Sequence, residues 1–547
     1  MLGIVMGPTW LQASSHFDSP IVKLAPWILG SVACVYAAPR VFRWFRTWKT
    51  LRPMPGPWDL LPFWFLLVSI KDNIRDGVEH RDATARIFSQ MCDLWKEYTD
   101  KTFKVYIGFT PIVMIHTPDA AEMLLTSNVN HKKPFLYGFI DFWLGPFNLL
   151  VSTGELWRFK RKLITPAFHF RVLDNYMRIF NENGDCLVKS IFQAIDNDPK
   201  EPVRLFKTTQ KCAMDIIGEV TMGAKLGLQE NKNLGFMTSF NRAMFLLSVR
   251  AFRPWFWVKT IYDNSMEGKM YNADVREMMK FTLSIMQQKI NTLKNEEITS
   301  TIAPDDNEAN SSENKETLMD LLMKKHREDD RYTLDDVRGD IDTIVAAGND
   351  TTTAAMCWTL NLLGHNPDVQ AKVHKELDEI FSSNHGDEIT ADDLRKMKYL
   401  ECCLKEALRL YPSFPVIGRL LDEELIMDGH KVPKGVMCFI SIFSLHRNPK
   451  YFKDPESFMP ERFLSDEIKS RHPYSYIPFS GGSKNCIGQK FAMIEMKLLL
   501  AKVLRKCKVE SKIPLDQLKV AYEVITKDKG GNKAWIRRRT EFSSILQ

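Results

Sequence analysis

Apolar residues recur at helical spacing along most of the 547-residue chain. One such segment runs from Val337 to Leu363 and predicts a long buried helix, and another apolar segment extends from Phe491 to Leu504. The strongest strand pattern is Leu425 to Met427, an Asp428-Gly429 turn and then Val436 to Ile442, which together predict a hairpin. We therefore expect a mainly α fold with small β-sheets, organised as one large domain.

Residues 295–316 interrupt the helical pattern, because they are polar and acidic and carry no apolar stripe. A segment of this composition cannot bury enough apolar surface to fold by itself. Both flanks keep the helical pattern, so we expect a mobile surface loop inside the large domain and not a boundary between two domains.

The N-terminal region predicts a membrane anchor. Residues 24–38 are uncharged and mostly apolar, and with the preceding residues they approach the lower length limit of a membrane helix. Several arginine and lysine residues follow, which the positive-inside rule places in the cytosol. We expect a short lumenal N-terminus over 1–20, an anchor helix over 21–39, a basic, proline-rich hinge over 40–57 and the large domain over 58–547.

Composition narrows the classes of function. The hydrophobic fraction of 45% suffices for a large core, and residues 58–70 add an apolar patch that fits either this core or a bilayer surface. The ten cysteines are scattered without a paired metal-binding spacing, which suits a reducing compartment. The net charge of +7 is modest, and no stripe of basic and aromatic residues indicates nucleic-acid binding.

The strongest candidate for chemistry is a cysteine in a glycine-rich loop before an apolar helical segment. The loop has the spacing Phe479-x-x-Gly482-x-Lys484-x-Cys486-x-Gly488. Glycine has no Cβ, so its backbone can approach a flat ligand closely. A cysteine at the start of a helix meets free N–H groups, which favour its thiolate form. These features fit an axial haem ligand, whereas an isolated cysteine is more often a buried structural residue.

This loop resembles the haem-binding signature of the cytochrome P-450 family, the haem-thiolate monooxygenases. The resemblance implies non-covalent haem b, with Cys486 as the axial ligand of its iron and with Phe479, Gly482, Lys484 and Gly488 beside the haem. The family usually has arginine at the position of Lys484. Lysine keeps the positive charge beside a haem propionate but lacks the planar fork that binds a carboxylate with two hydrogen bonds.

The predicted long helix has an unusual middle, because residues 347–353 combine one glycine, two Asx residues and three threonines. Such residues are poor helix formers and compete for backbone groups, so they predict a local distortion with room for a small ligand. A helix end is the alternative, but the apolar pattern resumes beyond them. The segment resembles the family's oxygen-activation motif. The resemblance implies that Thr351 hydrogen-bonds dioxygen, that Asp350 helps to deliver protons, and that Ala347 and Gly348 border the haem.

A second group of motifs is expected to support the cysteine loop. Glu406 and Arg409 share a face of one predicted helix, and Arg462 lies downstream in a Pro-Glu-Arg-Phe run. By itself the first pair is typical of a surface salt bridge. The family resemblance implies that the three residues form a buried charged network with a structural role.

The resemblance also implies anchors for the haem propionates. Trp157 and Arg161 stand at i and i+4 and share a helix face, and Arg419 matches a further propionate-binding arginine of the family. Other cations fall in the same parts of the sequence and predict either a docking face for an acidic electron donor or an ordinary solvated surface: Arg158, Lys160, Lys162, Lys484 and Lys490.

Further runs, at residues 143–145, 152–157 and 163–170, resemble the clan of the animal fatty-acid ω-hydroxylases, insect members included. Many members of that clan have a glutamate that forms an ester to the haem where this chain has Ala347, which supports non-covalent haem. The aromatic segment 135–142 is a candidate border of the substrate pocket, although aromatic residues at such spacing are more often core residues.

The resemblance implies a monooxygenase in the endoplasmic reticulum membrane, with its catalytic domain on the cytosolic side. Its substrate would be hydrophobic (a fatty acid, a hormone-like lipid or a xenobiotic), and its electrons would come from NADPH through NADPH-cytochrome reductase, with cytochrome b5 as a second candidate donor. Two alternatives stay open. One is a reductase-independent haem-thiolate isomerase, against which the Asp350-Thr351 pair argues, and the other is a non-enzymatic haem sensor or carrier.

Overall fold

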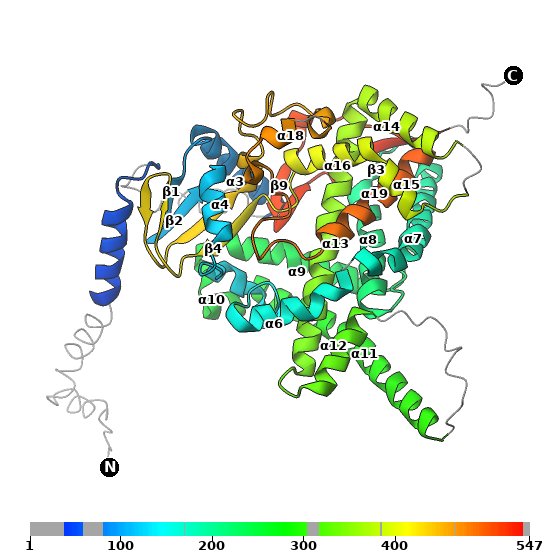
Figure 1. Ribbon diagram of the computed structural model, residues 1–547, viewed down its shortest axis with the longest axis horizontal. Helices are drawn as coiled ribbons and strands as arrows, with labels where there is room; N and C mark the ends of the chain where they lie inside the picture. The colour runs from blue at the N-terminus through cyan, green and yellow to red at the C-terminus, as the bar shows by residue number, and fades with distance from the viewer. Residues whose placement is uncertain are drawn as a thin grey trace, which may run out of the picture.

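The structure is a computed structural model that describes residues 38–57, 80–168, 170–302, 317–382, 386–464 and 467–539. Helices dominate it and small β-sheets lie mainly at one side, which confirms the expected mainly α fold (Figure 1). The expected anchor over 21–39 falls outside the described residues except at its last two positions. Among the residues described, no helix is both long and apolar enough to cross a membrane.

The α-helices that carry labels are α3 (His80–Glu97), α4 (Pro118–Thr126), α5 (Asp141–Leu144), α6 (Gly154–Ile164), α7 (Phe170–Asn197), α8 (Leu205–Met222), α9 (Leu234–Phe252), α10 (Lys259–Asn264), α11 (Met266–Ile302), α12 (Leu318–Glu328), α13 (Leu334–His365), α14 (Pro367–Ile380), α15 (Ala391–Lys396), α16 (Lys398–Leu410), α17 (Ile442–Leu445), α18 (Glu467–Ser470) and α19 (Gln489–Lys506). Short 3-10 helices are η1 (Phe135–Ile140), η2 (Thr165–Phe168), η3 (Pro254–Trp257), η5 (Pro460–Phe463), η6 (Pro473–Ser475) and η7 (Leu515–Gln517). The strands are β1 (Phe103–Ile107), β2 (Thr110–Ile115), β3 (Val203–Arg204), β4 (Val416–Leu420), β5 (Leu425–Met427), β6 (His430–Val432), β7 (Met437–Ser441), β8 (Cys507–Glu510), β9 (Val520–Glu523), β10 (Ile525–Asp528) and β11 (Lys533–Arg538).

Helix α13 runs through the middle of the helical body and is the expected long buried helix (Figure 1). It begins at a capping box, in which the Thr333 side chain accepts from the backbone N–H of Asp336 and the Asp336 side chain accepts from that of Thr333. The distortion expected at residues 347–353 is absent, because the helix is continuous there. Instead, the hydroxyls of Thr351 and Thr353 donate to carbonyls four residues earlier, which leaves the backbone hydrogen bonds intact.

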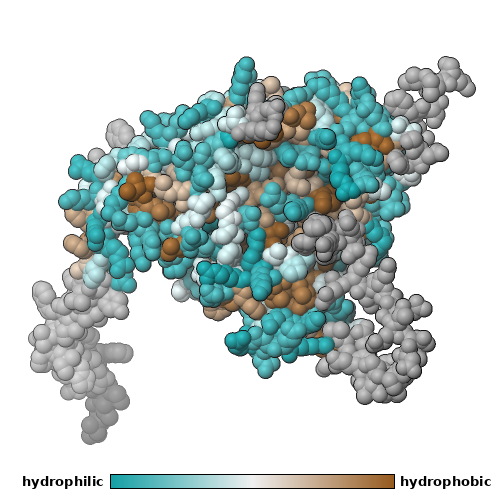
Figure 2. All heavy atoms as spheres, in the orientation of Figure 1, coloured by the Kyte–Doolittle hydropathy of each residue, from teal (hydrophilic) through white to brown (hydrophobic). Residues whose placement is uncertain are grey.

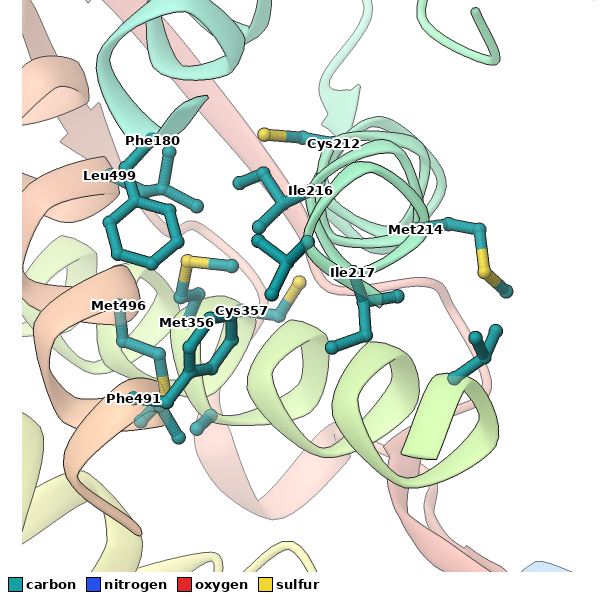
Figure 3. Packing of buried hydrophobic residues seen from close by; sticks show 14 of the residues in the cluster. Phe180, Cys212, Met214, Ile216, Ile217, Met356, Cys357, Phe491, Met496 and Leu499 are labelled. Carbon is teal, nitrogen blue, oxygen red and sulfur yellow. The ribbon is translucent and has the colours of Figure 1, made fainter. Parts of the chain in front are cut away.

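The main hydrophobic core forms where α7, α8, α13 and α19 meet. Phe491 of α19 stacks edge-on against Phe180 of α7 with ring centroids 5.2 Å apart, which fixes the start of α19. The contact between α8 and α13 is close, because a Cβ on Gly348 would lie 2.8 Å from the Ile217 side chain. Figure 3 shows the side chains that fill this region, from Phe180, Cys212, Met214, Ile216, Ile217, Met356, Cys357, Phe491, Met496 and Leu499.

The largest sheet has the strand order β1-β2-β7-β4, with β2 and β7 parallel and the other pairs antiparallel. The sequence predicted that Leu425–Met427 pairs with Val436–Ile442, and this pairing is wrong. The actual partner of β5 is β6, because Asp428 and Gly429 both have positive φ and form a tight two-residue turn. Strand β7 instead joins β2 and β4 in the larger sheet.

The segment expected to be a hinge over 40–57 is a helix over residues 38–51, followed by a proline-rich stretch fixed to β1. The Lys104 ammonium donates to the carbonyls of Leu51 and Arg52 at 3.2 and 3.0 Å, so it caps the end of this helix. The polar segment 295–316 also differs from expectation, because its first residues belong to α11, and 303–316 lie outside the described residues. Figure 2 shows mostly hydrophilic residues on one face of the molecule, with hydrophobic ones in separate small areas.

Candidate active site

The cysteine loop between Phe479 and α19 is closed by its own backbone. The N–H of Cys486 donates to the carbonyl of Phe479 at 2.9 Å, and Gly488 is the N-cap of α19. Gly482 has φ +68, and a Cβ there would lie 1.9 Å from the carbonyl oxygen of Leu125 at the end of α4. Glycine at 482 is therefore required by the neighbouring backbone, a reason that the sequence did not indicate.

Cys486 is exposed, unlike the other cysteines in the described part of the chain, which are buried or half-buried. Its side chain is open on one side, while the surrounding protein encloses the rest. Burial raises the pKa of the Cys486 thiol, and the Gly488 N–H and the Arg161 guanidinium act in the opposite direction. The N–H at the helix start therefore favours the thiolate, as expected from the sequence, but burial outweighs it and leaves the pKa of the thiol raised. A bound metal ion would lower this pKa, since it deprotonates a coordinating thiol.

A group of cations gathers beside the cysteine loop without a matching negative charge. Arg161, Arg419, Lys484 and Lys133 make no ion pair with any aspartate or glutamate of the described residues. Burial lowers the pKa of Lys133, and the charges of Arg419 and Lys484 lower it further. Burial and Arg419 likewise lower the pKa of Lys484, to about 8. Such a cluster is costly unless anions enter it.

Three expected propionate anchors lie in this cation cluster, with Trp157 beside them. Arg161 donates to the carbonyl of Asn485 at 2.8 Å and to its side-chain oxygen at 2.9 Å, so it also holds the cysteine loop. Arg419, on β4, is 3% exposed and donates to the Gly418 carbonyl at 3.0 Å. The Lys484 ammonium donates to the Ser152 carbonyl at 2.5 Å and lies 5.2 Å from the centre of a Trp157 ring.

The sequence missed two residues at this site, Lys133 of the cation cluster and the neighbouring His131. The Lys133 ammonium lies 5.1 Å from the centre of the Tyr137 ring, and the His131 ring lies edge-on to Trp157 with centroids 5.8 Å apart. Burial lowers the pKa of His131, and the nearby Lys484 adds to that effect. Neither residue belongs to a recognisable motif, and the only signal was two basic residues just before the aromatic segment at 135.

One of the cations expected on the docking face is not on the surface. Lys160 is 1% exposed and its ammonium contacts the carboxylates of Asp336 and Asp340 at 3.2 and 2.9 Å. Lys160 therefore joins α6 to α13 and cannot contact a protein partner. Lys162 and Lys490 are exposed, and Arg158 is exposed beside Glu155.

The expected charged network is present and fully paired. Arg409 binds Glu406 through two hydrogen bonds of 2.8 Å, and Arg462 reaches the same carboxylate at 3.3 Å. Glu406 and Arg409 are wholly buried. The remaining donors of Arg409 bind the carbonyls of His446, Pro455 and Ser457.

His446 connects this network to the cysteine loop. Its Nε2 accepts from the backbone N–H of Ile477 at 2.8 Å, two residues before Phe479. Burial lowers the pKa of His446 to about 3, and the charge of Arg409 adds to that effect. The ring is therefore neutral at physiological pH and serves as a fixed acceptor.

Helix α13 is buried along most of its length but open at Ala347 and Thr351, which stand one turn apart. Gly348 instead faces Ile217 of α8, so its missing side chain serves helix packing. The Thr351 hydroxyl donates to the Ala347 carbonyl at 2.7 Å, and the Asp350 carboxylate accepts from Gln210 and Lys527. No hydrogen bond joins the side chains of Asp350 and Thr351 within the described residues.

An open cysteine, an open helix face and unpaired cations fit a flat, dianionic ligand with a single axial protein ligand. Within the described residues no group of three or more His, Cys, Asp or Glu side chains could hold a metal ion. A model of the family described as Cytochrome P450 matches residues 55–530. The chain belongs to the cytochrome P450 family. It is thus a haem-thiolate monooxygenase that binds haem b non-covalently.

The sequences of relatives from vertebrates and insects align with most of the length of this P450. Cytochrome P450 4V2 of Rattus norvegicus is 35% identical over 91% of this chain and 92% of its own. Cytochrome P450 4V2 of Homo sapiens is 34% identical over 98% and 99%, and Cytochrome P450 4c3 of Drosophila melanogaster is 32% identical over 90% of each. These similarities place the P450 in the clan that its motifs resemble.

Proposed function

We propose that this P450 inserts one atom of O2 into a hydrophobic substrate, such as a fatty acid, a hormone-like lipid or a foreign compound, with electrons from NADPH. The reaction is RH + O2 + NADPH + H⁺ → ROH + H2O + NADP⁺, and a reductase passes the electrons. We place the protein at the endoplasmic reticulum membrane with this domain in the cytosol. The observation that carries the proposal is the open face of α13, where an alcohol, Thr351, stands beside an acid, Asp350.

Haem supplies the redox chemistry when bound, since it accepts the electrons and activates O2. The protein residues have separate tasks. Cys486 would be the axial ligand, and the cation cluster of Lys133, Arg161, Arg419 and Lys484 would bind the two propionates. Formation of the water in each cycle takes up two protons, and Asp350 and Thr351 of α13 would pass these protons to the oxygen side.

The support for a large apolar substrate comes from the segment between the cation cluster and α13. The backbone N–H of Gly418 donates to the Tyr137 hydroxyl at 3.2 Å, and Arg338 of α13 donates to the Trp143 carbonyl at 2.8 Å. These bonds hold η1 and α5 as an aromatic wall between β4 and α13. Phe135 and Phe142 of this wall are half exposed, as in a site that binds apolar ligands.

The decisive experiment combines a spectrum with turnover. The reduced, carbon-monoxide-bound protein should show the absorption of thiolate-ligated haem, and Cys486→Ser should lose it while Cys92→Ser keeps it. Fatty acids and small lipophiles are then incubated with NADPH, reductase and the P450, and products are detected by mass. A product that carries one added oxygen supports the proposal. An altered product without NADPH would show an isomerase, and binding without any product would show a sensor or carrier.

A further inference from the structure

A pocket of about 690 Å³ lies between α3 and α17. Helix α16 contributes its C-cap, Tyr411, and residues 518–520 at the start of β9 complete the wall. The volume falls within the range of about 300–1,000 Å³ that is typical of small-molecule sites. None of the described residues that line the pocket belongs to α13 or to the cysteine loop. The pocket is therefore separate from the candidate active site.

Hydrophobic groups form much of the wall of this pocket. Four of them are half-buried, so that part of each stays accessible to a ligand: Tyr411, Phe443, Leu518 and Val520. Phe88 of α3 stacks edge-on against Phe443 with ring centroids 5.3 Å apart and supports the wall. A ligand with an apolar body would remove this surface from water, which favours its binding.

Tyr411 is a preformed part of the wall. Its ring stacks on that of Trp358 in α13, with centroids 3.8 Å apart and planes 6° apart. Trp358 is wholly buried, and its indole N–H donates to the Thr526 carbonyl at 3.1 Å. A ring held in this way loses little freedom when a ligand binds, which favours affinity. Through this stack the pocket also bears on α13, the helix that carries Thr351.

Arg447 places an incompletely paired cation in the pocket. Its guanidinium lies 3.7 Å from the centre of the Phe443 ring and 5.5 Å from that of Tyr411. The Nε donates to Glu456 at 3.1 Å and Nη1 donates to the Phe443 carbonyl at 3.4 Å, whereas Nη2 has no acceptor among the described residues. The Arg447 side chain is 11% exposed and that of Glu456 is 69% exposed. An ion pair with so exposed a partner is weak, so Arg447 is able to bind another carboxylate.

The charges around the pocket leave an excess of one positive charge. Four cations and three carboxylates line it: Arg86, Lys96, Arg447, Lys519, Asp93, Asp100 and Glu456. Burial lowers the pKa of Arg447, while Glu456 acts in the opposite direction and the nearby Arg409 adds to the effect of burial. A ligand with a single negative charge balances this excess, whereas a cationic ligand would increase it.

We propose that this pocket is a second ligand site, which binds a small hydrophobic monocarboxylate. The carboxylate contacts the Arg447 guanidinium, whose planar fork matches it, and the apolar body lies against Tyr411, Phe443 and Leu518. The proposal goes beyond the monooxygenase reaction, because a ligand held here is bound and not oxidised. Neither Cys486 nor Thr351 lines the pocket.

The test measures the binding of 2-naphthoate and of its neutral isostere, 2-naphthamide, to the haem-loaded full chain by equilibrium dialysis. 4-Phenylimidazole is added first at a concentration that saturates the haem iron, so that the active site is occupied. We expect naphthoate to bind, and naphthamide to bind about tenfold more weakly because it cannot make the charged hydrogen bond. The measurement needs no NADPH, reductase or known substrate, so its failure is distinct from failure of the proposed function.

Two variants change the affinity in opposite directions. Arg447→Met should weaken naphthoate about tenfold and leave naphthamide unchanged, so that the two ligands bind alike. Glu456→Gln removes the carboxylate that competes for Arg447 and should tighten naphthoate about two- to threefold. If the pair of Arg447 and Glu456 were only structural, Glu456→Gln would change thermal stability and neither affinity.

Two further variants serve as controls. Glu510→Gln also removes an exposed carboxylate paired with an arginine, Arg537, but lies outside the pocket and should leave both affinities unchanged. Cys92→Trp places a large side chain in the pocket and should abolish the binding of both ligands. Thermal unfolding and the spectrum with 4-phenylimidazole show for each variant that the fold and the active site are intact.

Two results would overturn the proposal. If 4-phenylimidazole displaces all of the naphthoate, the acid binds only in the active site. If naphthoate binds equally to the wild type, Arg447→Met and Cys92→Trp, it binds elsewhere on the protein.

Discussion

Two charged regions flank the cysteine loop and differ in how their charges are balanced. In the network of Glu406, Arg409 and Arg462, every charge has a partner and the buried carboxylate accepts from both arginines. In the cation cluster, Arg419 and Lys133 are held against other cations, and burial lowers the pKa of both. The first region is electrostatically complete, whereas no carboxylate in the described part of the chain forms an ion pair with the cations of the second.

The contrast separates scaffold from binding site. A complete network stabilises the fold whether or not a ligand is bound, and removal of one member strands a buried charge. An incomplete cluster costs folding free energy in the free protein, and a dianionic ligand recovers that cost on binding. Variants of the two regions should therefore affect folding and haem retention in different proportions.

The largest effect is expected from Glu406→Ala. This variant leaves the Arg409 guanidinium buried without a counter-charge, which typically costs about 3–5 kcal/mol of folding free energy. Unfolding by denaturant, measured with and without haem, should show a loss in both forms. Glu461→Gln, in the same Pro-Glu-Arg-Phe run, is the matched control, because Glu461 is partly exposed and pairs with Lys372. If haem fully restored the stability of Glu406→Ala, the network would belong to the binding site and the contrast would be wrong.

Arg419→Met should not lower the stability of the free protein but should weaken haem binding. The free protein no longer has to bury this cation, so its unfolding temperature should rise or stay constant. The haem complex loses a charged hydrogen bond, worth about 1.5–3 kcal/mol, so haem transfer to an acceptor protein should become roughly tenfold to a hundredfold faster. A fall in stability of the free protein equal to that of the complex would show that Arg419 is structural.

Much of the site was predictable from sequence, because its motifs are local. Cys486 and Gly488 share one loop, and Glu406 and Arg409 share one helix face, so spacing along the chain already placed them together. The structural reason for each residue of the cysteine loop was harder to predict. Gly482 is required by the carbonyl of Leu125, which lies in a distant helix.

Contacts between distant segments could not be predicted, since tertiary packing alone creates them. Gln210 and Lys527 are 140 and 177 residues from Asp350 and belong to no motif. Lys133 reaches the cation cluster because the carbonyl of the preceding residue, Lys132, accepts a hydrogen bond from the backbone N–H of Leu420 in β4. The pairing of β5 was also missed, because the conformation of a two-residue turn outweighed the stronger strand pattern farther on.

A pH experiment probes the paired network of Glu406, Arg409 and Arg462 through the neighbouring His446. Its pKa is about 3 when folded and about 6.5 when free, so the unfolded chain binds more protons between these values. The contribution of His446 to the free energy of unfolding is fully present above pH 6.5. It falls as the pH drops towards 3, by up to about 1.4 kcal/mol per pH unit. His446→Gln keeps an acceptor for the Ile477 N–H without titrating, so its unfolding free energy should fall less steeply below pH 6.5.

Other buried histidines set the background for that measurement. Burial also lowers the pKa of His116 to about 3 and that of His374 to about 4, so acid should still destabilise His446→Gln through them. Haem loading should not change the difference between the variant and the wild type in how steeply the unfolding free energy falls with pH, because His446 belongs to the paired network. An equal slope in both proteins would contradict the neutral, buried state of His446.

The smallest effect is expected from Lys484→Arg, which restores the residue usual in the family signature. Lys484 places one ammonium in the cluster, and this ammonium donates a hydrogen bond to the Ser152 carbonyl. A guanidinium could keep that contact and still offer a second N–H to a propionate, a gain of about 0.5–1.5 kcal/mol. Haem transfer to an acceptor protein should slow by a few-fold, while the stability of the free protein, which still buries one cation, should not change. Faster haem loss in Lys484→Arg would mean that the cluster is shaped around lysine, with Lys133 as the cation that compensates for the missing fork.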